Sequence, residues 1–343
     1  MAAVMNCFRL EFAGPGRVDI KPLSVKEPGE NEVLVKTCMS AVSPGTEMLV
    51  YRGQWPAGVA TDSTIPALSG QFSYPLSYGY CTVGRVVETG ISVAEDWYNR
   101  RVFAFQPHQS LFLASPQELV AIPDDIDDET ALFLANMETA VNLLLDGRPL
   151  IGEQVVVLGQ GIIGLLTTAL LLQFPLATLT TLDRYSLRRK AARDMGVAYC
   201  YDPAEPGLLE QLGATEGQGG KADLLFELSG NPAALNTALA LSRFSGRVVI
   251  GSWYGAKKSQ LDLGSFFHRG RVSLMSSQVS RLDPGLTGRW QKSRRLQFAW
   301  EMLRRTDPAV FITQRFDLAD ACSAYSLIDQ HPEETIQVIF EYT

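Results

Sequence analysis

The stretch that decides the fold runs from residue 154 to 164 and reads Gln-Val-Val-Val-Leu-Gly-Gln-Gly-Ile-Ile-Gly. Its apolar, β-branched start predicts a buried strand, and the three spaced glycines predict a tight turn into a helix over 165–172. In such a turn the backbone approaches a pyrophosphate, and the helix N-terminus favours its charge. We therefore expect a dinucleotide site whose phosphate-binding residues are Gly159, Gly161, Ile162, Ile163 and Gly164.

The residue at the end of the next predicted strand, 178–182, bears on whether the protein binds NAD or NADP. Asp183 lies there, 19 residues after Gly164. A carboxylate at this point can accept hydrogen bonds from the adenosine ribose and repels a 2′-phosphate, which favours NAD over NADP. Arg184, Arg188 and Arg189 follow, and a guanidinium cluster could hold a 2′-phosphate. NADP therefore stays open as the less favoured cofactor.

The same region imitates a membrane helix, because no charged residue occurs between 154 and 182. That length could span the hydrocarbon layer. The glycines and Pro175 interrupt it, however, so we expect a strand, a turn and a buried helix and no membrane segment.

Composition narrows the class of protein further. The chain has 343 residues, of which 46% are hydrophobic and 20% charged, and its formal charge is −7. These values predict a folded protein of two domains without a nucleic-acid partner. The five cysteines are scattered and the N-terminus has no signal-peptide pattern, so we expect reduced thiols and a cytoplasmic location.

The pattern of strands changes near residue 123. Before it, short β-branched runs alternate with turn residues, at 7–12, 33–36, 82–87, 101–105 and 118–122. After it, strands at 154–158, 178–182, 198–201, 223–228, 247–250 and 272–275 are separated by helical stretches. An amphipathic helix over 294–305 and a strand over 335–340 close the chain. This alternation predicts an α/β fold in which a β-rich domain is followed along the chain by a doubly wound parallel sheet.

A long segment, 54–80, contains one charged residue and many aromatic ones. Ordered loops of this length tend to be functional. We expect it to border a roomy cleft for a bulky or cyclic substrate; the alternative is a loop folded onto its own domain.

Several further motifs resemble the medium-chain dehydrogenase/reductase superfamily of zinc-type alcohol dehydrogenases. The motifs are 43–47 (Ser-Pro-Gly-Thr-Glu), 51–53, 77–80 with 83–87, 251–255, 276–279 and 289–290. They are similar to the branch that includes bacteriochlorophyllide a dehydrogenase. The resemblance implies a GroES-like catalytic domain over 1–122, a Rossmann cofactor domain over 123–290, a segment 291–343 that returns to the catalytic domain, a small-molecule substrate and a homodimer.

The resemblance also implies which residues stand at the family's zinc positions. The first ligand position falls on Ser43, the second on Tyr80 and the third close to Asn136 and Met137. Cys81 and Glu138 are the nearest remaining ligand types, and zinc needs three ligands from Cys, His or carboxylate. We therefore expect no metal site.

Other family positions belong to the cofactor. Thr139 matches the threonine beside the nicotinamide. Ser229 and Gly230 match one turn at the carboxyl edge of the sheet, and Gly251 and Ser252 match the next.

Without zinc, a side chain must handle the proton of the reacting hydroxyl. The candidates are Tyr80, Thr46, Glu47 and His108. Tyr80 could bind the substrate oxygen or simply pack in the wall of the cleft. Glu47 resembles a family acid that anchors structure through an ion pair, and His108 could relay a proton or stabilise its loop.

Three functions follow from these observations. The first is a zinc-independent, NAD-dependent oxidoreductase that interconverts a secondary alcohol and a ketone by hydride transfer. The second is an NADPH-dependent quinone or enone reductase, and the third a non-catalytic nucleotide-binding redox sensor.

Overall fold

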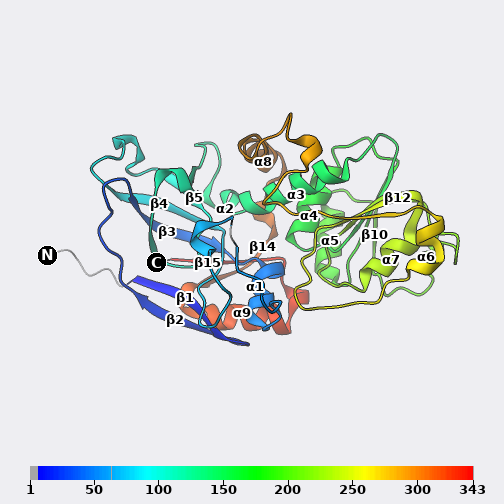
Figure 1. Cartoon of the computed structure of the whole chain (residues 1–343), viewed down its shortest axis with the longest axis horizontal. Coiled ribbons are helices and arrows are strands. Elements are labelled where there is room, and N and C mark those ends of the chain that lie inside the picture. The colour runs from blue at the N-terminus through cyan, green and yellow to red at the C-terminus, as the bar shows by residue number, and fades with distance from the viewer. Residues whose placement is uncertain (1–6, 63, 343) are drawn as a thin grey trace. The chain divides into compact units, whose positions relative to one another are not determined.

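The computed structural model describes residues 7–62 and 64–342, and the chain divides into two compact units (Figure 1). Unit 1 consists of Met1–Ala135 and Asp307–Thr343, and unit 2 of Asn136–Thr306. These limits differ from the expected ones at 122 and 290. The short helix α2 (Asp128–Ala131) contacts the turn Pro308–Phe311 of unit 1, whereas α8 (Lys292–Thr306) packs on α4 (Ile162–Leu171) of unit 2.

Unit 2 is built on a six-stranded parallel sheet with the order β10-β9-β8-β11-β12-β13. Its strands are β8 (Gln154–Leu158), β9 (Thr178–Leu182), β10 (Tyr199–Tyr201), β11 (Ala222–Glu227), β12 (Ser242–Ile250) and β13 (Ser273–Ser276). This order is that of the dinucleotide-binding doubly wound fold. All six strands lie at the predicted places, and the doubly wound sheet is confirmed.

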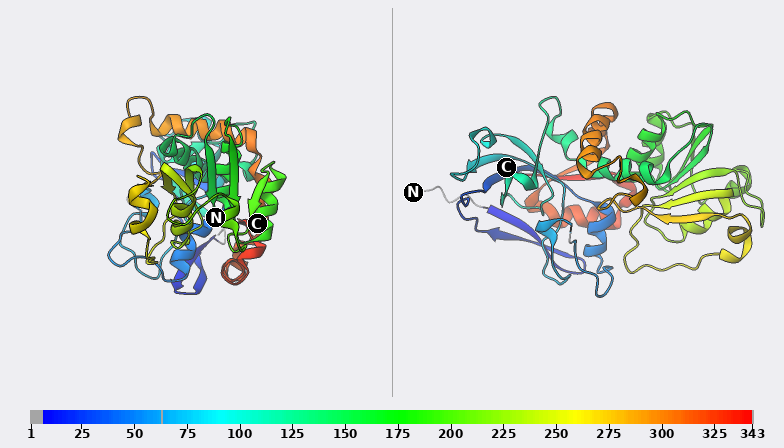
Figure 2. Two further views of the ribbon diagram at one scale, coloured as in Figure 1. Left: turned by 90° about the vertical axis from the view of Figure 1, so that its right-hand side faces the viewer. Right: turned by 45° about the horizontal axis from the view of Figure 1, so that its top comes forward.

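Helices cover both faces of this sheet (Figure 2). They are α3 (Leu134–Gly147), α4, α5 (Ser186–Asp194), α6 (Leu208–Gln211), α7 (Ala234–Leu241) and α8. Val155 and Val157 of β8 pack with side chains of α3 and α4, whereas Val156 and Leu158 pack with those of α6 and α7. Successive side chains of a strand point to opposite faces, so a strand covered on both sides must be apolar throughout. This burial explains the uninterrupted apolar run.

Unit 1 contains a seven-stranded sheet with the order β14-β15-β3-β4-β5-β7, and β6 pairs with β3 beside this path. The strands are β3 (Val33–Ala41), β4 (Thr82–Thr89), β5 (Arg101–Ala104), β6 (Leu111–Ala114), β7 (Leu119–Ala121), β14 (Ile312–Asp317) and β15 (Gln337–Glu341). A separate antiparallel hairpin joins β1 (Cys7–Gly14) and β2 (Arg17–Leu23). The helices α1 (Pro44–Tyr51) and α9 (Ala321–Gln330) complete the unit.

The long segment 54–80 packs against its own unit. The rings of Trp55 and Phe72 are stacked at 4.9 Å, and the Tyr78 ring meets Trp55 edge-on at 5.7 Å. Trp55 and Tyr78 are buried in the core of unit 1. These rings therefore fill the interior of a folded loop, as in the second of the two interpretations above, and do not by themselves line a cleft.

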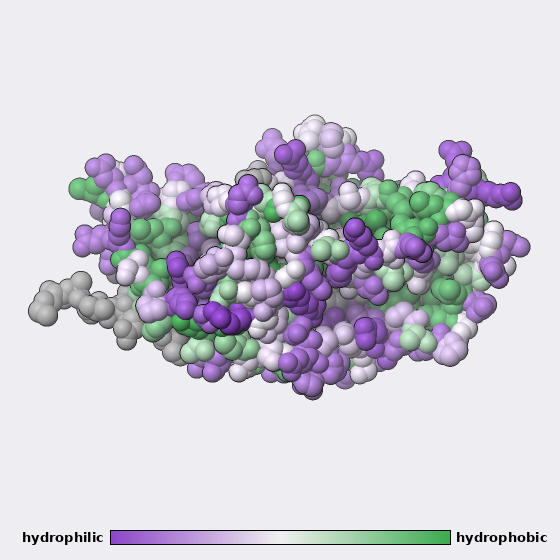
Figure 3. Space-filling model, turned by 60° about the horizontal axis from the view of Figure 1, so that its bottom comes forward, coloured by the Kyte–Doolittle hydropathy of each residue, from purple (hydrophilic) through white to green (hydrophobic). Residues whose placement is uncertain are grey.

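The charge-free stretch 154–182 forms β8, α4 and β9, as expected. Among the described residues, no helix combines the length and the apolar character needed to cross a membrane. On the face drawn in Figure 3, hydrophilic side chains are interspersed with the apolar ones.

Candidate active site

The turn between β8 and α4 has the stereochemistry of a phosphate-binding loop. Gly159 has φ +95°, and a Cβ there would lie 2.6 Å from the backbone of Leu228. A Cβ on Gly164 would lie 2.0 Å from the Gly159 carbonyl oxygen. Gly161 is the N-cap of α4, and the nearest atom to a Cβ there is Nη1 of Arg188, at 3.8 Å. Two glycines are thus required by packing, and the third keeps the helix N-terminus open.

Ile162 and Ile163 begin α4 directly after this cap. Their backbone N–H groups belong to the first turn, where an α-helix leaves its amides without intrahelical partners. The predicted phosphate-binding residues are therefore gathered at one helix N-terminus, which fits a dinucleotide.

The Asp183 carboxylate is hydrogen-bonded to the glycine turn between β8 and α4. Its Oδ2 accepts the backbone N–H of Gln160 at 2.7 Å, and its Oδ1 accepts that of Tyr185 at 2.8 Å. The side chain is largely buried. The carboxylate thus lies beside the glycine turn, as the sequence predicts; its contact with a ribose stays a prediction.

The three arginines after Asp183 divide into two kinds. Arg189 donates to the Asp183 carbonyl at 2.7 Å and pairs with Asp202 at 3.0 Å. The guanidinium groups of Arg184 and Arg188 lie over the Tyr185 ring, 5.1 and 4.8 Å from its centroid. Burial lowers the pKa of Arg188, and the nearby Asp183 carboxylate opposes this effect. Arg184 and Arg188 are thus the two arginines that could meet a 2′-phosphate.

A buried carboxylate organises the carboxyl edge of the sheet. Glu227, at the end of β11, accepts hydrogen bonds from the N–H and hydroxyl of Ser229, and the Tyr254 hydroxyl donates to it at 2.5 Å. Its carbonyl accepts the N–H groups of Gly251 and Ser252. The Ser252 hydroxyl oxygen in turn accepts the N–H of Gly230 at 2.9 Å. The four residues that were predicted for these turns are therefore brought together.

Glu227 itself was not predicted. The available signal was a carboxylate directly after the apolar run Leu224–Phe226, at the end of a buried strand. Such a residue can remain ionised in the interior only if hydrogen-bond donors surround it. Burial and the Glu227 carboxylate both raise the pKa of Tyr254, so the phenol stays protonated and remains a donor.

Thr139 lies on α3, and its neighbour Glu138 anchors this helix. The Glu138 carboxylate accepts two hydrogen bonds from the buried Arg295 of α8, at 2.9 and 3.1 Å. Arg295 also donates to the Asn142 side chain and to the Val279 carbonyl. The ion pair therefore fixes the helix that carries Thr139.

In unit 1, three hydroxyl groups meet around Ser43 and Tyr80, two of the positions where the resemblance places metal ligands. The Tyr80 hydroxyl forms a short hydrogen bond with that of Ser43 and lies 3.4 Å from that of Thr46. Ser43 is the N-cap of α1, and Thr46 is in its first turn. Burial raises the pKa of Tyr80, so its phenol is a hydrogen-bond donor at neutral pH and not a phenolate base. We call these three residues the hydroxyl cluster.

The other two predicted catalytic residues form a separate, buried pair. His108 Nε2 lies 3.1 Å from Oε2 of Glu47, and both side chains have no exposed area. Glu47 also accepts the backbone N–H of Ser43 at 2.7 Å and the hydroxyl of Tyr325. Thr46 and Tyr80 are thus close together, whereas Glu47 and His108 lie behind them.

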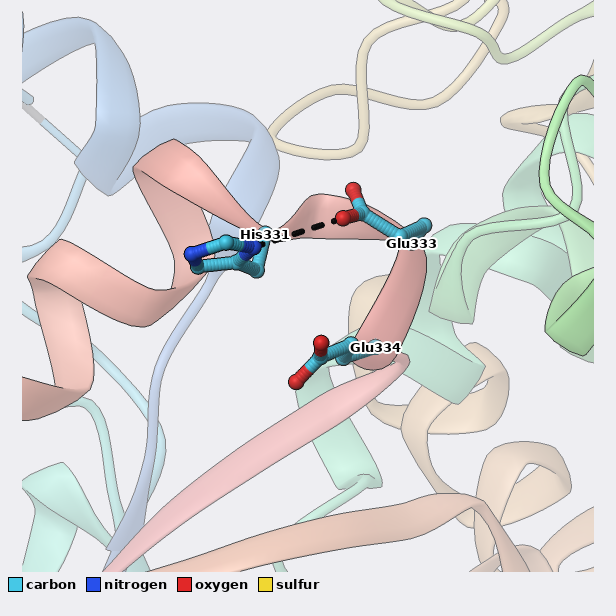
Figure 4. A group of neighbouring side chains, drawn as sticks. All are labelled: His331, Glu333 and Glu334. Atoms are coloured by element: carbon cyan, nitrogen blue, oxygen red, sulfur yellow. Dashed lines mark ion pairs between the residues drawn. The ribbon is translucent and has the colours of Figure 1, made fainter.

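Among the residues that the structure describes, one group of at least three potential metal ligands gathers its donor atoms within 4.8 Å (Figure 4). It consists of His331, Glu333 and Glu334, which are exposed and follow α9. His331 and Glu333 form an ion pair at 3.4 Å. The group contains no residue of the predicted site.

Comparisons with known proteins identify relatives of this chain. A family model described as zinc-binding dehydrogenase matches residues 163–296. An L-threonine 3-dehydrogenase of Vibrio parahaemolyticus is 34% identical over 65% of this chain and 70% of its own length. A D-guloside 3-dehydrogenase of Escherichia coli is 23% identical over 90% of this chain and 92% of its own length.

Solved structures show the same fold over nearly the full length. An alcohol dehydrogenase of Escherichia coli, solved with NADH, has a TM-score of 0.79 at 18% identity and covers 98% of this chain and 100% of its own. A putative zinc-binding dehydrogenase of Sinorhizobium meliloti, bound to NADP, has a TM-score of 0.75 at 19% identity and covers 98% and 99%. The solved structures show the shared fold, and the sequence matches show that the chain belongs to the zinc-binding dehydrogenase family of alcohol dehydrogenase-like oxidoreductases.

Proposed function

We propose that the protein is a zinc-independent, NAD(H)-dependent oxidoreductase that interconverts a secondary alcohol and a ketone on a bulky or cyclic substrate. The observation that carries this proposal is the hydroxyl cluster, in which Ser43 and Tyr80 stand at two of the positions where the resemblance places metal ligands, and Thr46 lies beside Tyr80. When bound, the nicotinamide supplies or accepts the hydride.

The donor atoms near this cluster do not fit a zinc ion. Zinc takes thiolate, imidazole or carboxylate ligands, and the cluster offers neutral hydroxyls. Cys81 is a single buried thiol, and burial raises its pKa. The Glu47 carboxylate already accepts hydrogen bonds from three groups. Glu138, which the resemblance gives as a remaining ligand type, is paired with Arg295 within unit 2. These contacts support chemistry without a metal.

Tyr80 is the group best suited to bind the reacting oxygen. A protonated phenol can donate to a carbonyl oxygen and stabilise the negative charge that develops on it during reduction. The Ser43 and Thr46 hydroxyls hold the phenol and can pass a proton onward. In the oxidising direction the proton of the alcohol would pass along the same hydroxyls, each giving up one proton as it accepts another, and would leave to solvent water at the partly exposed Thr46.

Asp183 supports NAD as the preferred dinucleotide. Its carboxylate lies against the glycine turn, where a 2′-phosphate would bring further negative charge. Arg184 and Arg188 favour the opposite preference, and with it the enone or quinone reductase as the second candidate function. Relative affinity for the two dinucleotides separates the two candidates.

The names of the relatives support a secondary alcohol as substrate. They include 3-dehydrogenases of a D-guloside and of L-threonine, and a sorbitol dehydrogenase of Bacillus subtilis. The guloside enzyme matches most of this chain, which supports a cyclic substrate. The resemblance to bacteriochlorophyllide a dehydrogenase and the homodimer stay predictions.

Titration with NADH and with NADPH, followed by nicotinamide fluorescence, tests the cofactor. We expect NADH to bind at least about tenfold more tightly, a difference of about 1.4 kcal/mol. Tight NADPH with negligible NADH binding would favour the reductase, and absence of both would contradict both enzyme functions. Binding without turnover of any secondary alcohol, ketone or enone would favour the sensor.

The chemistry is tested with metal analysis and with Tyr80→Phe. Purified protein is expected to contain well under one zinc per chain, and chelation should leave turnover of secondary alcohols unchanged. Y80F should lower kcat by about 100-fold while the affinity for NADH stays the same. Tyr98→Phe, at an exposed tyrosine, is the matched control. One zinc per chain, with loss of activity on chelation, would contradict the proposal.

A further inference from the structure

The buried pair Glu47–His108 lies directly behind the hydroxyl cluster in unit 1. The Glu47 side chain has no exposed area, and its Oε2 lies 3.1 Å from Nε2 of the His108 ring. On the far side of that ring, Nδ1 lies 2.7 Å from the hydroxyl of Ser40, which is 2.8 Å from that of Tyr342. A buried carboxylate of this kind is stable only while its donors stay in place, so the network has one defined geometry.

The network contacts the cluster through a backbone group. Glu47 Oε1 accepts the N–H of Ser43, whereas the Ser43 hydroxyl bonds to Tyr80. A peptide N–H does not exchange its proton during turnover, so these two hydrogen bonds give no path for a proton from Tyr80 to Glu47. What Glu47 does fix is the backbone position of Ser43, and through it the partner of the Tyr80 hydroxyl.

His108 fixes the other side of Tyr80. Gly79, which precedes Tyr80, has φ +117°, and a Cβ on it would lie 2.7 Å from Nε2 of His108. The imidazole ring is therefore packed directly on the backbone of the segment that carries the phenol. The backbone N–H of His108 also donates to the Tyr78 carbonyl, at 3.4 Å.

We propose that Glu47 and His108 are positioning residues that set the place of the Tyr80 hydroxyl, Glu47 through Ser43 and His108 through Gly79. This role rests on the proposed function, in which Tyr80 binds the reacting oxygen. It differs from both of the roles considered for His108 from the sequence, because the ring neither relays the proton nor stabilises only its own loop.

Spectroscopy of Tyr80 tests the positioning without any substrate. In full-length protein labelled with [ζ-13C]tyrosine, the signal that Y80F removes belongs to Tyr80. His108→Asn keeps a polar group near Ser40 but leaves Glu47 without its partner, and it should shift this signal. His108→Gln places an amide donor near Nε2 and should return the signal most of the way. An unchanged signal in folded H108N would overturn the proposal.

Ser40→Ala is the fallback if H108N does not fold, since it removes one hydroxyl beyond the ring. It should shift the Tyr80 signal in the same direction by a smaller amount, and an unshifted signal would count against the proposal. His331→Gln makes a matched change at an exposed histidine and should leave the signal unchanged.

Kinetics distinguish a positioning carboxylate from a general base. Glu47→Gln retains an oxygen that can accept the Ser43 N–H but has no charge, whereas Glu47→Ala removes the acceptor. With a secondary alcohol that the wild type oxidises, E47Q should lose less than about tenfold in kcat, and E47A about 100-fold, without change in the KM for NAD. Equal loss in both variants would identify Glu47 as the base and overturn the proposal.

The failures of the two proposals are distinguishable. If the wild type binds NADH but oxidises no secondary alcohol, the proposed function fails, and the Tyr80 signal still decides the positioning. If the wild type is active and the Tyr80 signal is the same in H108N as in the wild type, only the positioning role fails.

Discussion

Each unit has a buried carboxylate that holds the loops next to it, and the two carboxylates differ in the groups that contact them. Glu47 in unit 1 faces an imidazole, a hydroxyl and one backbone N–H. Glu227 in unit 2 is held by the Ser229 N–H and by the hydroxyls of Ser229 and Tyr254. Glu47 thus has an imidazole nitrogen among its partners, whereas the partners of Glu227 are hydroxyl groups and one backbone N–H. Both carboxylates connect neighbouring loops of their own unit, but they do so through different hydrogen-bond donors.

Removing each carboxylate is the strongest test of this comparison. Glu227→Ala frees both turns at the carboxyl edge, and we expect NADH affinity to fall at least about 100-fold, with about 3 kcal/mol lost from the free energy of unfolding. Glu47→Ala should destabilise by a similar amount but leave NADH affinity within about twofold. Fluorescence titration and urea unfolding measure both quantities, and an equal loss of NADH affinity would show that the two carboxylates are not specialised.

Removing one hydroxyl donor from each carboxylate gives a smaller effect. Tyr254→Phe and Tyr325→Phe each leave a buried carboxylate short of one hydrogen bond, which costs about 1–2 kcal/mol. Only Y254F should also weaken NADH binding, by about tenfold. The two substitutions are chemically identical, so each is the control for the other, and a weakened NADH affinity in Y325F would contradict the division of roles.

The smallest effect concerns high pH. Burial and the adjacent carboxylate raise the pKa of Tyr254 and of Tyr325 above the ordinary value of 10.0. The folded protein therefore keeps protons that the unfolded chain loses, so the stability is complete below pH 10 and declines as the pH rises beyond it. Urea unfolding between pH 8 and 11 should show a shallower decline in Y254F and Y325F than in the wild type or in Y98F. Equal slopes in all four would contradict these pKa shifts.

The cofactor unit was predictable from the sequence because its signals are local. The apolar run at 155–158 and the spaced glycines determine a strand, a turn and a helix without reference to distant residues. Asp127 is the N-cap of α2 and accepts the Thr130 N–H at 2.7 Å, a contact that spans three residues. In contrast, β2 (Arg17–Leu23) was missed, because Pro22 and its charged neighbours conceal the alternation of a strand.

The site was less predictable, because its contacts join residues far apart in the chain. Tyr325 meets Glu47 across 278 residues, and Tyr342 meets Ser40 across 302. Nothing in the local pattern around Tyr325 or Tyr342 indicates these partners. The family resemblance supplied Tyr80 and Thr46 as candidates, and only the structure separates them from the buried pair Glu47 and His108.

The order of the elements has a consequence for biosynthesis. Unit 2 is one continuous segment, so it can fold as soon as residue 306 has left the ribosome. The sheet of unit 1 includes β15, which pairs with β3 through Ile339–Glu341. Nearly the whole chain must therefore be translated before that sheet is complete. In a nascent chain, we expect the nucleotide-binding half to be protected from proteases first, while the half that carries Tyr80 waits for the final strands.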